Sequence, residues 1–273
     1  MPSVANSKKR GQAGRKQAAR ERVAAMRAEQ KRAERRRNLI TVGAIAAAVV
    51  IVGGGIGWYA ASRGGSSSSS SSSAEVVPAT PGGAPQSQPA ALVVPNTSGI
   101  SGVVAYDTAG WPAASKNGPA DQALGHDHVT VPVTYSVTPP VGGNHNPVWL
   151  NCGVYENPVP SEYAVHDIEH GAIWITYQPS LPQAEVSQLR SFVGRQSVLS
   201  PGGGAAGSRY MDLTPYPGLP APIVVSSWGF QLRLTSPTDP RLQQFVDKFR
   251  FSPQYSPEYP GECTGGTGTP AAT

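Results

Sequence analysis

The longest uninterrupted apolar stretch of the chain is Leu39–Ala60, which holds 22 residues and no charged side chain. A helix rises about 1.5 Å per residue, so about 20 apolar residues cross the ~30 Å hydrocarbon core of a membrane. Trp58 and Tyr59 stand near its C-terminal end, where aromatic rings favour the membrane interface. The stretch is longer than the apolar core of a signal peptide. It predicts one transmembrane helix, and a cleaved signal peptide is the alternative.

Shorter patterns in the second half of the chain predict both strands and helices. Three runs rich in β-branched or aromatic residues predict strands at His128–Tyr135 and Ala172–Tyr177, and a strand or hairpin at Ile223–Leu234. Two segments with apolar residues on one helical face predict helices at Pro182–Arg195 and at Asp239–Arg250, the latter with an aspartate N-cap. We expect an α+β domain whose helices pack on a short mixed or antiparallel sheet.

Composition marks the boundaries between these parts. Residues 61–120 are rich in Ser, Pro and Gly, include the serine run Ser66–Ser73, and cannot bury enough apolar surface to offset the entropy of ordering. They predict a flexible linker. The expected organisation is a basic tail at 1–38, the transmembrane helix at 39–60, the linker at 61–120, a folded domain at 121–263 and a disordered tail at 264–273.

The net charge of +5 conceals two parts of opposite sign. Residues 1–37 carry 13 Lys/Arg and 3 Asp/Glu, whereas the rest carries 9 Lys/Arg and 14 Asp/Glu. The acidic balance of the predicted domain argues against nucleic-acid binding. Basic residues precede the apolar stretch, so the positive-inside rule predicts a cytoplasmic N-terminus and an extracytoplasmic domain. We also expect the basic tail to contact anionic membrane lipids.

All five histidines lie within 45 residues of the predicted domain. His166 and His170 are four residues apart, a spacing at which a helix offers two imidazoles to one metal ion. His126 and His128 are two apart and would share one face of a strand, and His145 follows in a turn-rich loop. Imidazole ligands suit Cu or Zn better than Ca or Mg, so the cluster suggests a Cu or Zn site.

Glu169 and the histidines beside it leave three interpretations open. The first is metal binding, with Glu169 as a ligand or as a group that orients an imidazole. The second is a structural hydrogen-bond network. The third is metal-dependent hydrolysis, because His166–His170 match the His-x-x-Glu-His pattern of inverted zinc proteases, with Glu169 as general base. That pattern needs a sustained helix, and Gly171 followed by an apolar run argues against one.

Cys152 and Cys263 are the only cysteines. An even number of cysteines outside the cytoplasm predicts a disulfide between them. The alternative is that Cys152, seven residues after His145, is a thiolate ligand for Cu or Zn.

Four motifs of the predicted domain resemble a bacterial membrane-anchored family, catalogued as domain of unknown function 3105. They are Gly125–His128, Pro139–His145, Gly153–Tyr155 and His166–Gly171. The resemblance covers roughly residues 121–263 and implies a basic tail, one membrane span, a linker and a domain of this size. It implies no activity.

The chain departs from the family pattern at two places. Val141, Gly142 and Asn144 stand where the loop usually carries Thr, Ser and Pro, and His126 stands where Arg is usual. The site that the resemblance supports therefore consists of His128, His145, His166, His170 and Glu169, with His126 as a weaker candidate.

The sequence thus leads to the hypothesis of a membrane-tethered extracytoplasmic domain that binds Cu or Zn. One alternative is a non-enzymatic interaction module of the cell envelope with structural histidines and an unknown protein partner. The other is a metal-dependent hydrolase. The sequence leaves open whether the protein is an enzyme.

Overall fold

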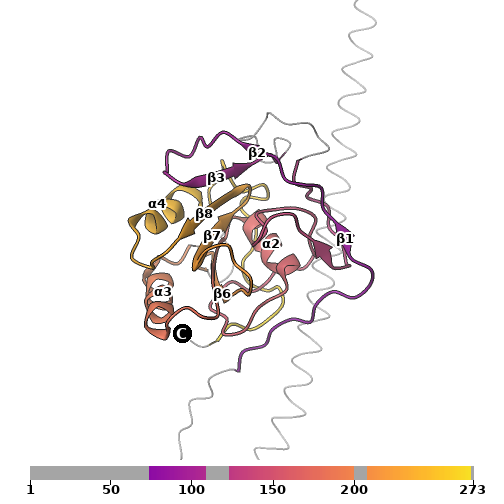
Figure 1. Cartoon of the computed structure of the whole chain (residues 1–273). Helices are drawn as coiled ribbons and strands as arrows, with labels where there is room; N and C mark the ends of the chain where they lie inside the picture. Colours follow the sequence, from indigo (N-terminus) through magenta and orange to yellow (C-terminus); the bar gives the residue numbers. More distant parts are fainter. Residues whose placement is uncertain (1–73, 109–122, 200–207, 272–273) are drawn as a thin grey trace, which may run out of the picture. The chain divides into compact units, whose positions relative to one another are not determined.

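A six-stranded mixed sheet lies at the centre of the described part of the chain, in the order β2-β3-β8-β7-β5-β6 (Figure 1). The computed structural model describes residues 74–108, 123–199 and 208–271. Strands β5 and β6 run parallel, and the other neighbouring strands are antiparallel. In spatial order the strands are β2 (Val93–Val94), β3 (Val103–Tyr106), β8 (Phe230–Leu234), β7 (Ile223–Ser227), β5 (Ile173–Tyr177) and β6 (Met211–Pro215).

The described residues also form helices and a second, two-stranded parallel sheet. The helices are α2 (Ser161–His170), α3 (Gln183–Arg195) and α4 (Pro240–Phe249). The small sheet pairs β1 (Gln86–Ser87) with β4 (Val133–Thr134). The α+β class with a mixed sheet, as predicted, is confirmed.

Strand β5 separates two apolar layers. All five of its residues are buried, and consecutive side chains of a strand point to opposite faces. Ile173 and Ile175 belong to a cluster with Leu189 of α3 and Phe245 of α4. Trp174 belongs to a second cluster with residues of α2. Helices α3 and α4 therefore cover one face of the sheet and α2 covers the other (Figure 1).

The helices predicted at Pro182–Arg195 and Asp239–Arg250 are confirmed as α3 and α4 within one residue at each end. Their apolar positions are buried as the helical spacing requires. Asp239 caps α4, because its carboxylate accepts a hydrogen bond of 2.9 Å from the Arg241 backbone N–H. Both amphipathic helices were predictable because one buried face dictates their pattern.

The strand predictions are confirmed where the strand is fully buried. Ala172–Tyr177 contains β5, and Ile223–Leu234 forms the β7–β8 hairpin, which turns at Gly229 with φ 75°. The strand predicted at His128–Tyr135 was too long. Only Val133–Thr134 is a strand, and His128 makes a single bridge to His145. Pro132 interrupts the run, because it has no N–H to donate to a partner strand.

Two segments outside the predicted domain take part in the fold. Residues 74–108, which fall within the predicted linker, contribute β1, β2 and β3, and β3 pairs with β8 in the central sheet. Residues 264–271, predicted as tail, bridge to Leu150 and Val76 through Thr267 and Thr269. The short strand β6 was also not predicted.

The predicted basic tail and the membrane span Leu39–Ala60 lie outside the described residues. Within the described ranges, no helix has the length and apolarity needed to span a membrane.

Candidate metal centre

Helix α2 carries His166, Glu169 and His170 on one face, because residues at i, i+3 and i+4 are neighbours on a helix. All three side chains are buried. The helix ends at Gly171, whose φ of 102° favours glycine, and a Cβ there would lie 2.5 Å from Ser256 Oγ. Gly171 therefore ends the helix, as the sequence indicated. The helix has ten residues and ends directly after His170.

His145 comes from the loop that approaches this face of α2. Its backbone N–H donates to Asp127 O at 3.0 Å, and its carbonyl accepts from Val129 N–H at 2.7 Å. These bonds form the bridge that brings His128 beside His145. The loop is closely packed at Gly143, where φ is 115° and a Cβ would meet neighbouring side chains at 3.1–3.3 Å. Two distant histidines are thus placed side by side by backbone hydrogen bonds.

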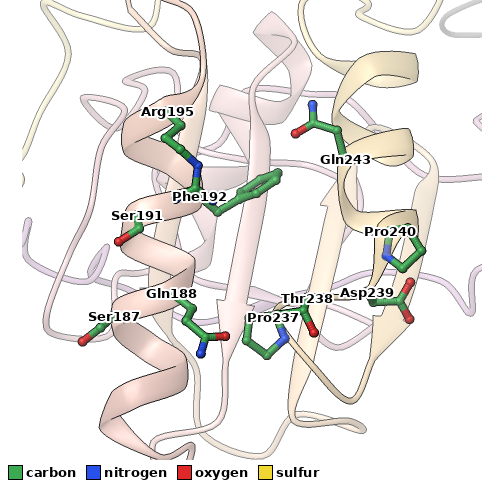
Figure 2. A pocket seen from close by; sticks show the side chains of 10 residues that line it. All are labelled: Ser187, Gln188, Ser191, Phe192, Arg195, Pro237, Thr238, Asp239, Pro240 and Gln243. Atoms are coloured by element: carbon green, nitrogen blue, oxygen red, sulfur yellow. The ribbon is translucent and has the colours of Figure 1, made fainter.

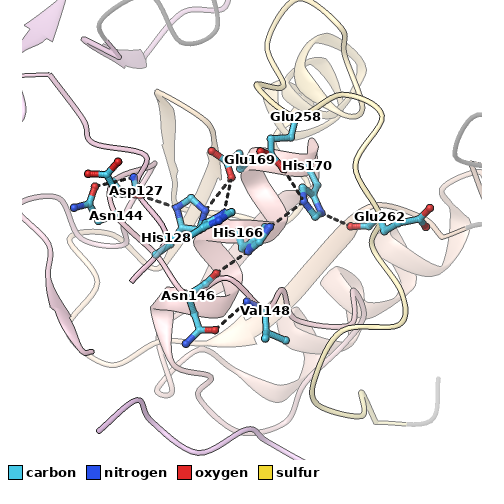
Figure 3. A network of polar contacts seen from close by, with 12 residues as sticks. Asp127, His128, Asn144, Asn146, Val148, His166, Glu169, His170, Glu258 and Glu262 are labelled. Atoms are coloured by element: carbon cyan, nitrogen blue, oxygen red, sulfur yellow. Dashed lines mark hydrogen bonds and ion pairs between the residues drawn. The ribbon is translucent and has the colours of Figure 1, made fainter. Parts of the chain in front are cut away.

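Four side chains bring ligand atoms within 4.8 Å of one another, namely His128, His145, His166 and Glu169. Nε2 of His145 lies 2.9 Å from Oε2 of Glu169. Nε2 of His128 lies 3.8 Å from the same oxygen (Figure 3). The His128 side chain is 42% exposed, whereas that of Glu169 is 2% exposed. The cluster is therefore buried except on the side of His128.

A second group of ligand atoms shares His166 with the first and includes His170 and Glu258. Nε2 of His166 lies 3.0 Å from Nε2 of His170. Oε2 of Glu258 lies 3.4 Å from that nitrogen of His170, and the Glu258 side chain is 44% exposed (Figure 3). The two groups therefore form one continuous site with His166 in the middle.

Backbone carbonyls fix the tautomer of each buried histidine. Nδ1 of His145 contacts Gly143 O at 2.8 Å, and Nδ1 of His166 contacts Asn146 O at 2.7 Å. Nδ1 of His170 contacts Glu262 O. A carbonyl oxygen only accepts, so each Nδ1 must carry the proton and each neutral ring keeps a lone pair on Nε2. A ring whose other nitrogen donates to a backbone carbonyl is typical of metal-binding histidines.

The Nε2 lone pairs lack suitable protein donors. In the described part of the chain, neither Nε2 of His145 nor Oε2 of Glu169 has a partner in hydrogen-bond geometry, although the two atoms are 2.9 Å apart. The two atoms are close enough for an ion pair, but they are not aligned for a hydrogen bond, and misaligned hydrogen bonds are weak. Acceptor atoms that converge in this way, without a proton in line between them, suit a shared cation.

Burial, together with the neighbouring His170 and His145, lowers the pKa of His166 to about 3. His166 is therefore neutral at physiological pH. Because its Nδ1 proton is donated to Asn146 O, its Nε2 lone pair is available to an ion.

The structure brings together five of the residues predicted for the site: His128, His145, His166, Glu169 and His170. His126 is exposed and belongs to neither group. Sequence reasoning missed Glu258, because it lies 88 residues after His170 and carries no local motif. The predicted disulfide was a usable signal, because pairing of Cys263 with Cys152 brings the segment that contains Glu258 close to Cys152.

Cys152 and Cys263 form a disulfide with a Cα–Cα distance of 5.3 Å. The alternative of Cys152 as a thiolate ligand is not compatible with this pairing. Neither sulfur belongs to the two groups that contain histidine.

A separate groove of about 510 Å³ lies between α3 and the start of α4 (Figure 2). Most of its lining residues are polar, with Arg195 on one side and Asp239 on the other, and none is a histidine. The groove is therefore not part of the histidine site.

Fold and site together define an α+β domain with a histidine–carboxylate cluster beside a mixed sheet. The family model described as "protein of unknown function (DUF3105)" matches residues 126–265, and the chain belongs to this family. The match includes every residue of both ligand groups. The family resemblance is thus confirmed, and membrane anchoring stays a prediction. No curated protein and no solved structure matches the chain.

Proposed function

We propose that this domain binds one transition-metal ion, Cu or Zn, through His145, His166 and Glu169. His128 completes the set on the exposed side, and His170 with Glu258 forms its outer part. The observation that carries this proposal is the tautomer pattern. Three buried histidines give their Nδ1 protons to backbone carbonyls, and the Nε2 atoms of two of them, His145 and His166, converge with the buried carboxylate of Glu169.

The residues present fit such an ion in chemistry and in charge. Imidazole nitrogens with a carboxylate oxygen are ligands of Zn, and imidazole-rich sites also suit Cu. Isolated burial of an ionised carboxylate is costly unless a cation or donors compensate it. A bound ion supplies positive charge next to Glu169, where the described partners of this side chain are histidines.

Both groups share the Nε2 atom of His166, which has one lone pair and cannot bind two ions. We therefore infer a stoichiometry of one ion per chain. Two ions per chain would require His128, His145 and Glu169 to hold an ion without His166.

We also propose that the Leu39–Ala60 span tethers this domain to the outer face of the cell membrane. The span and its basic flank support this location, and the disulfide is of the kind that persists in an oxidising compartment.

Hydrolysis is less well supported. A metal-activated hydrolase needs a general base beside the ligands, whereas Glu169 lies among them.

The direct test is the metal content of the full-length protein, purified without a His tag and measured by mass spectrometry. Residues 74–108 contribute strands, so a shorter domain would remove part of the fold. We expect near-stoichiometric Cu or Zn in the wild type, loss in His166→Ala, and retention in the matched control His126→Ala. A folded wild type that stays metal-free after incubation with both metals would refute the proposal.

Thermal unfolding with and without a chelator separates metal binding from a structural network. A ligand that binds only the folded state raises the unfolding temperature. We expect chelation to lower the melting temperature of the wild type and to leave His166→Ala unchanged. In a purely structural network, chelation would change neither protein.

A further inference from the structure

A second reactive cluster surrounds the Cys152–Cys263 disulfide, and the proposed metal function does not use it. Cys152 is partly exposed and lines a cavity of about 220 Å³, together with Ser208, Arg209 and Thr264. Cys263 is 1% exposed and does not line this cavity. The cavity therefore gives outside molecules access to the Cys152 side of the disulfide.

A buried carboxyl group lies directly behind the accessible cysteine. Asp212 on β6 is fully buried, and its Oδ2 is 3.8 Å from Cys152 Sγ. Its Oδ1 accepts a hydrogen bond of 3.1 Å from the Gly153 backbone N–H, which holds the carboxyl group against the cysteine. Burying a carboxyl group is unfavourable. A disulfide that only crosslinks the chain needs no such group.

The other ionisable groups facing Asp212 are Asp167 of α2 and Tyr155. Asp167 and Tyr155 each interact electrostatically with Asp212. Burial raises the pKa of Asp212 to about 7. Near neutral pH, Asp212 therefore exists in both protonation states and can give or take a proton.

We propose that Cys152–Cys263 is a reactive disulfide that exchanges with dithiols, with Cys152 as the attacked sulfur and Asp212 as its acid and base. The substrate class is a dithiol, in a small molecule or at the active site of a partner protein. This activity is independent of the metal site.

The exchange proceeds in two balanced steps. A thiolate of the dithiol attacks Cys152 Sγ, the Cys152–Cys263 bond breaks, and Cys263 leaves as a thiolate that takes up one of the two protons released by the dithiol. The second thiolate of the dithiol then attacks its own sulfur in the mixed disulfide. Cys152 leaves as a thiolate and takes the proton of Asp212, which regains the second proton released by the dithiol. The dithiol is oxidised to a disulfide, and the cysteine pair is reduced to two thiols.

In the reverse direction, ionised Asp212 removes the Cys152 proton and creates the nucleophilic thiolate. A loss of this carboxyl group should therefore slow re-oxidation as well as reduction.

The test follows reduction and re-oxidation of the folded full-length protein, with dithiothreitol and then oxidised glutathione. EDTA is present throughout, and free thiols are trapped by alkylation and counted by mass. We expect the folded protein to be reduced faster than it unfolds. We expect Asp212→Asn to slow re-oxidation at pH 7 on the order of tenfold or more. The rates of all variants rise with pH as the attacking thiol ionises, and the wild-type profile should show an additional inflection near pH 7 that is absent in Asp212→Asn.

Asp107→Asn is the matched control, because Asp107 is also fully buried but is not among the groups around the disulfide. Its rates should equal those of the wild type. If the wild-type disulfide is reduced no faster than the protein unfolds globally, the proposal is overturned. This outcome does not depend on whether Asp212→Asn folds. Equal rates and pH profiles for folded Asp212→Asn and wild type would overturn the role of Asp212. Either result leaves the metal test unaffected.

Discussion

Glu169 is the residue whose burial most needs explanation. Its side chain is 2% exposed, and its Oε2 faces His145 and His128 without a hydrogen-bond partner among the described residues. If Glu169 belonged to a structural network, hydrogen bonds donated to its carboxylate should stabilise the fold. In a metal site it should cost stability in the metal-free state and be compensated only by the ion.

The variant Glu169→Gln separates these two roles because it keeps the shape and removes the charge. We expect the metal-free variant to melt at the same temperature as the wild type or higher. It should bind Cu or Zn at least about tenfold more weakly, because loss of a group that only orients a ligand already costs about 10- to 100-fold in affinity. Calorimetry and metal titration measure the two effects. A lower melting temperature with unchanged metal binding would contradict this prediction.

Asp212 gives a prediction for the pH dependence of stability. Its pKa is about 7 in the folded protein, above the ordinary value of 3.8. Between these values the unfolded chain releases the proton while the folded state keeps it, so this group makes stability fall as pH rises from about 4 to about 7. Each unit of pKa difference corresponds to about 1.4 kcal/mol.

Replacement of Asp212 by Asn removes this contribution. We expect the difference in unfolding free energy between Asp212→Asn and wild type to shift in favour of the variant as pH rises from 4 to 7. Denaturant titrations at both pH values measure it. A difference that is constant with pH would show that Asp212 titrates alike in both states.

At the scale of the element, the end of α2 positions the site. Gly171 follows the last ligand of the helix and adopts φ 102°, and a Cβ there would also lie 3.0 Å from Phe251 Cα. The glycine thus permits both the left-handed turn and the close approach of the segment after α4. This contact places the C-terminal segment, including Glu258 and Glu262, over His170.

Gly171→Ala should therefore destabilise the protein by roughly 1–3 kcal/mol, from the left-handed conformation and the close contacts. The matched control is Gly194→Ala in α3, where nothing lies within 4 Å of the added Cβ. That change should be neutral or stabilise by up to about 1 kcal/mol through helix propensity. Chemical denaturation of both variants measures the difference, and equal effects would contradict the role of Gly171.

At the scale of the whole molecule, the disulfide joins the C-terminal segment to the loop before α2 across 111 residues. This segment supplies Glu258 to the outer ligand group and the carbonyl that holds His170. Stability and metal binding should therefore both depend on the crosslink.

We expect the double variant Cys152→Ser/Cys263→Ser to lose roughly 2–5 kcal/mol of unfolding free energy, because the unfolded chain gains conformational freedom. Metal affinity should fall less than in His166→Ala, since only the outer ligand group loses its support. Denaturation and metal titration test this. A variant with wild-type stability would show that noncovalent contacts alone hold the C-terminal segment.

Elements with one strong local pattern were predictable from the sequence. The amphipathic helices α3 and α4 each present one apolar face, and β5, β7 and β8 are apolar runs bounded by turns. The i, i+4 spacing of His166 and His170 and the two cysteines likewise indicated the helix face and the disulfide. Family membership followed from short motifs in the same way.

The remaining elements depend on contacts between distant residues. Strand β6 reads Met-Asp-Leu-Thr-Pro, and its polar residues are buried only because it adds to the edge of the sheet beside β5. Strands β2 and β3 lie in a sequence typical of a linker and are ordered by pairing with β8. A local pattern cannot predict such pairing, because the favourable contacts come from another part of the chain.

The site residues likewise fall into those that the sequence predicted and those that only the tertiary structure revealed. The sequence by itself determined which residue types are available, and it grouped the histidines and Glu169 within one region. Only the tertiary structure decided that Glu258 joins them, that His126 does not, and that each buried histidine presents Nε2. The reason is physical: a ligand set depends on the direction of lone pairs, and backbone carbonyls far apart in the chain fix those directions.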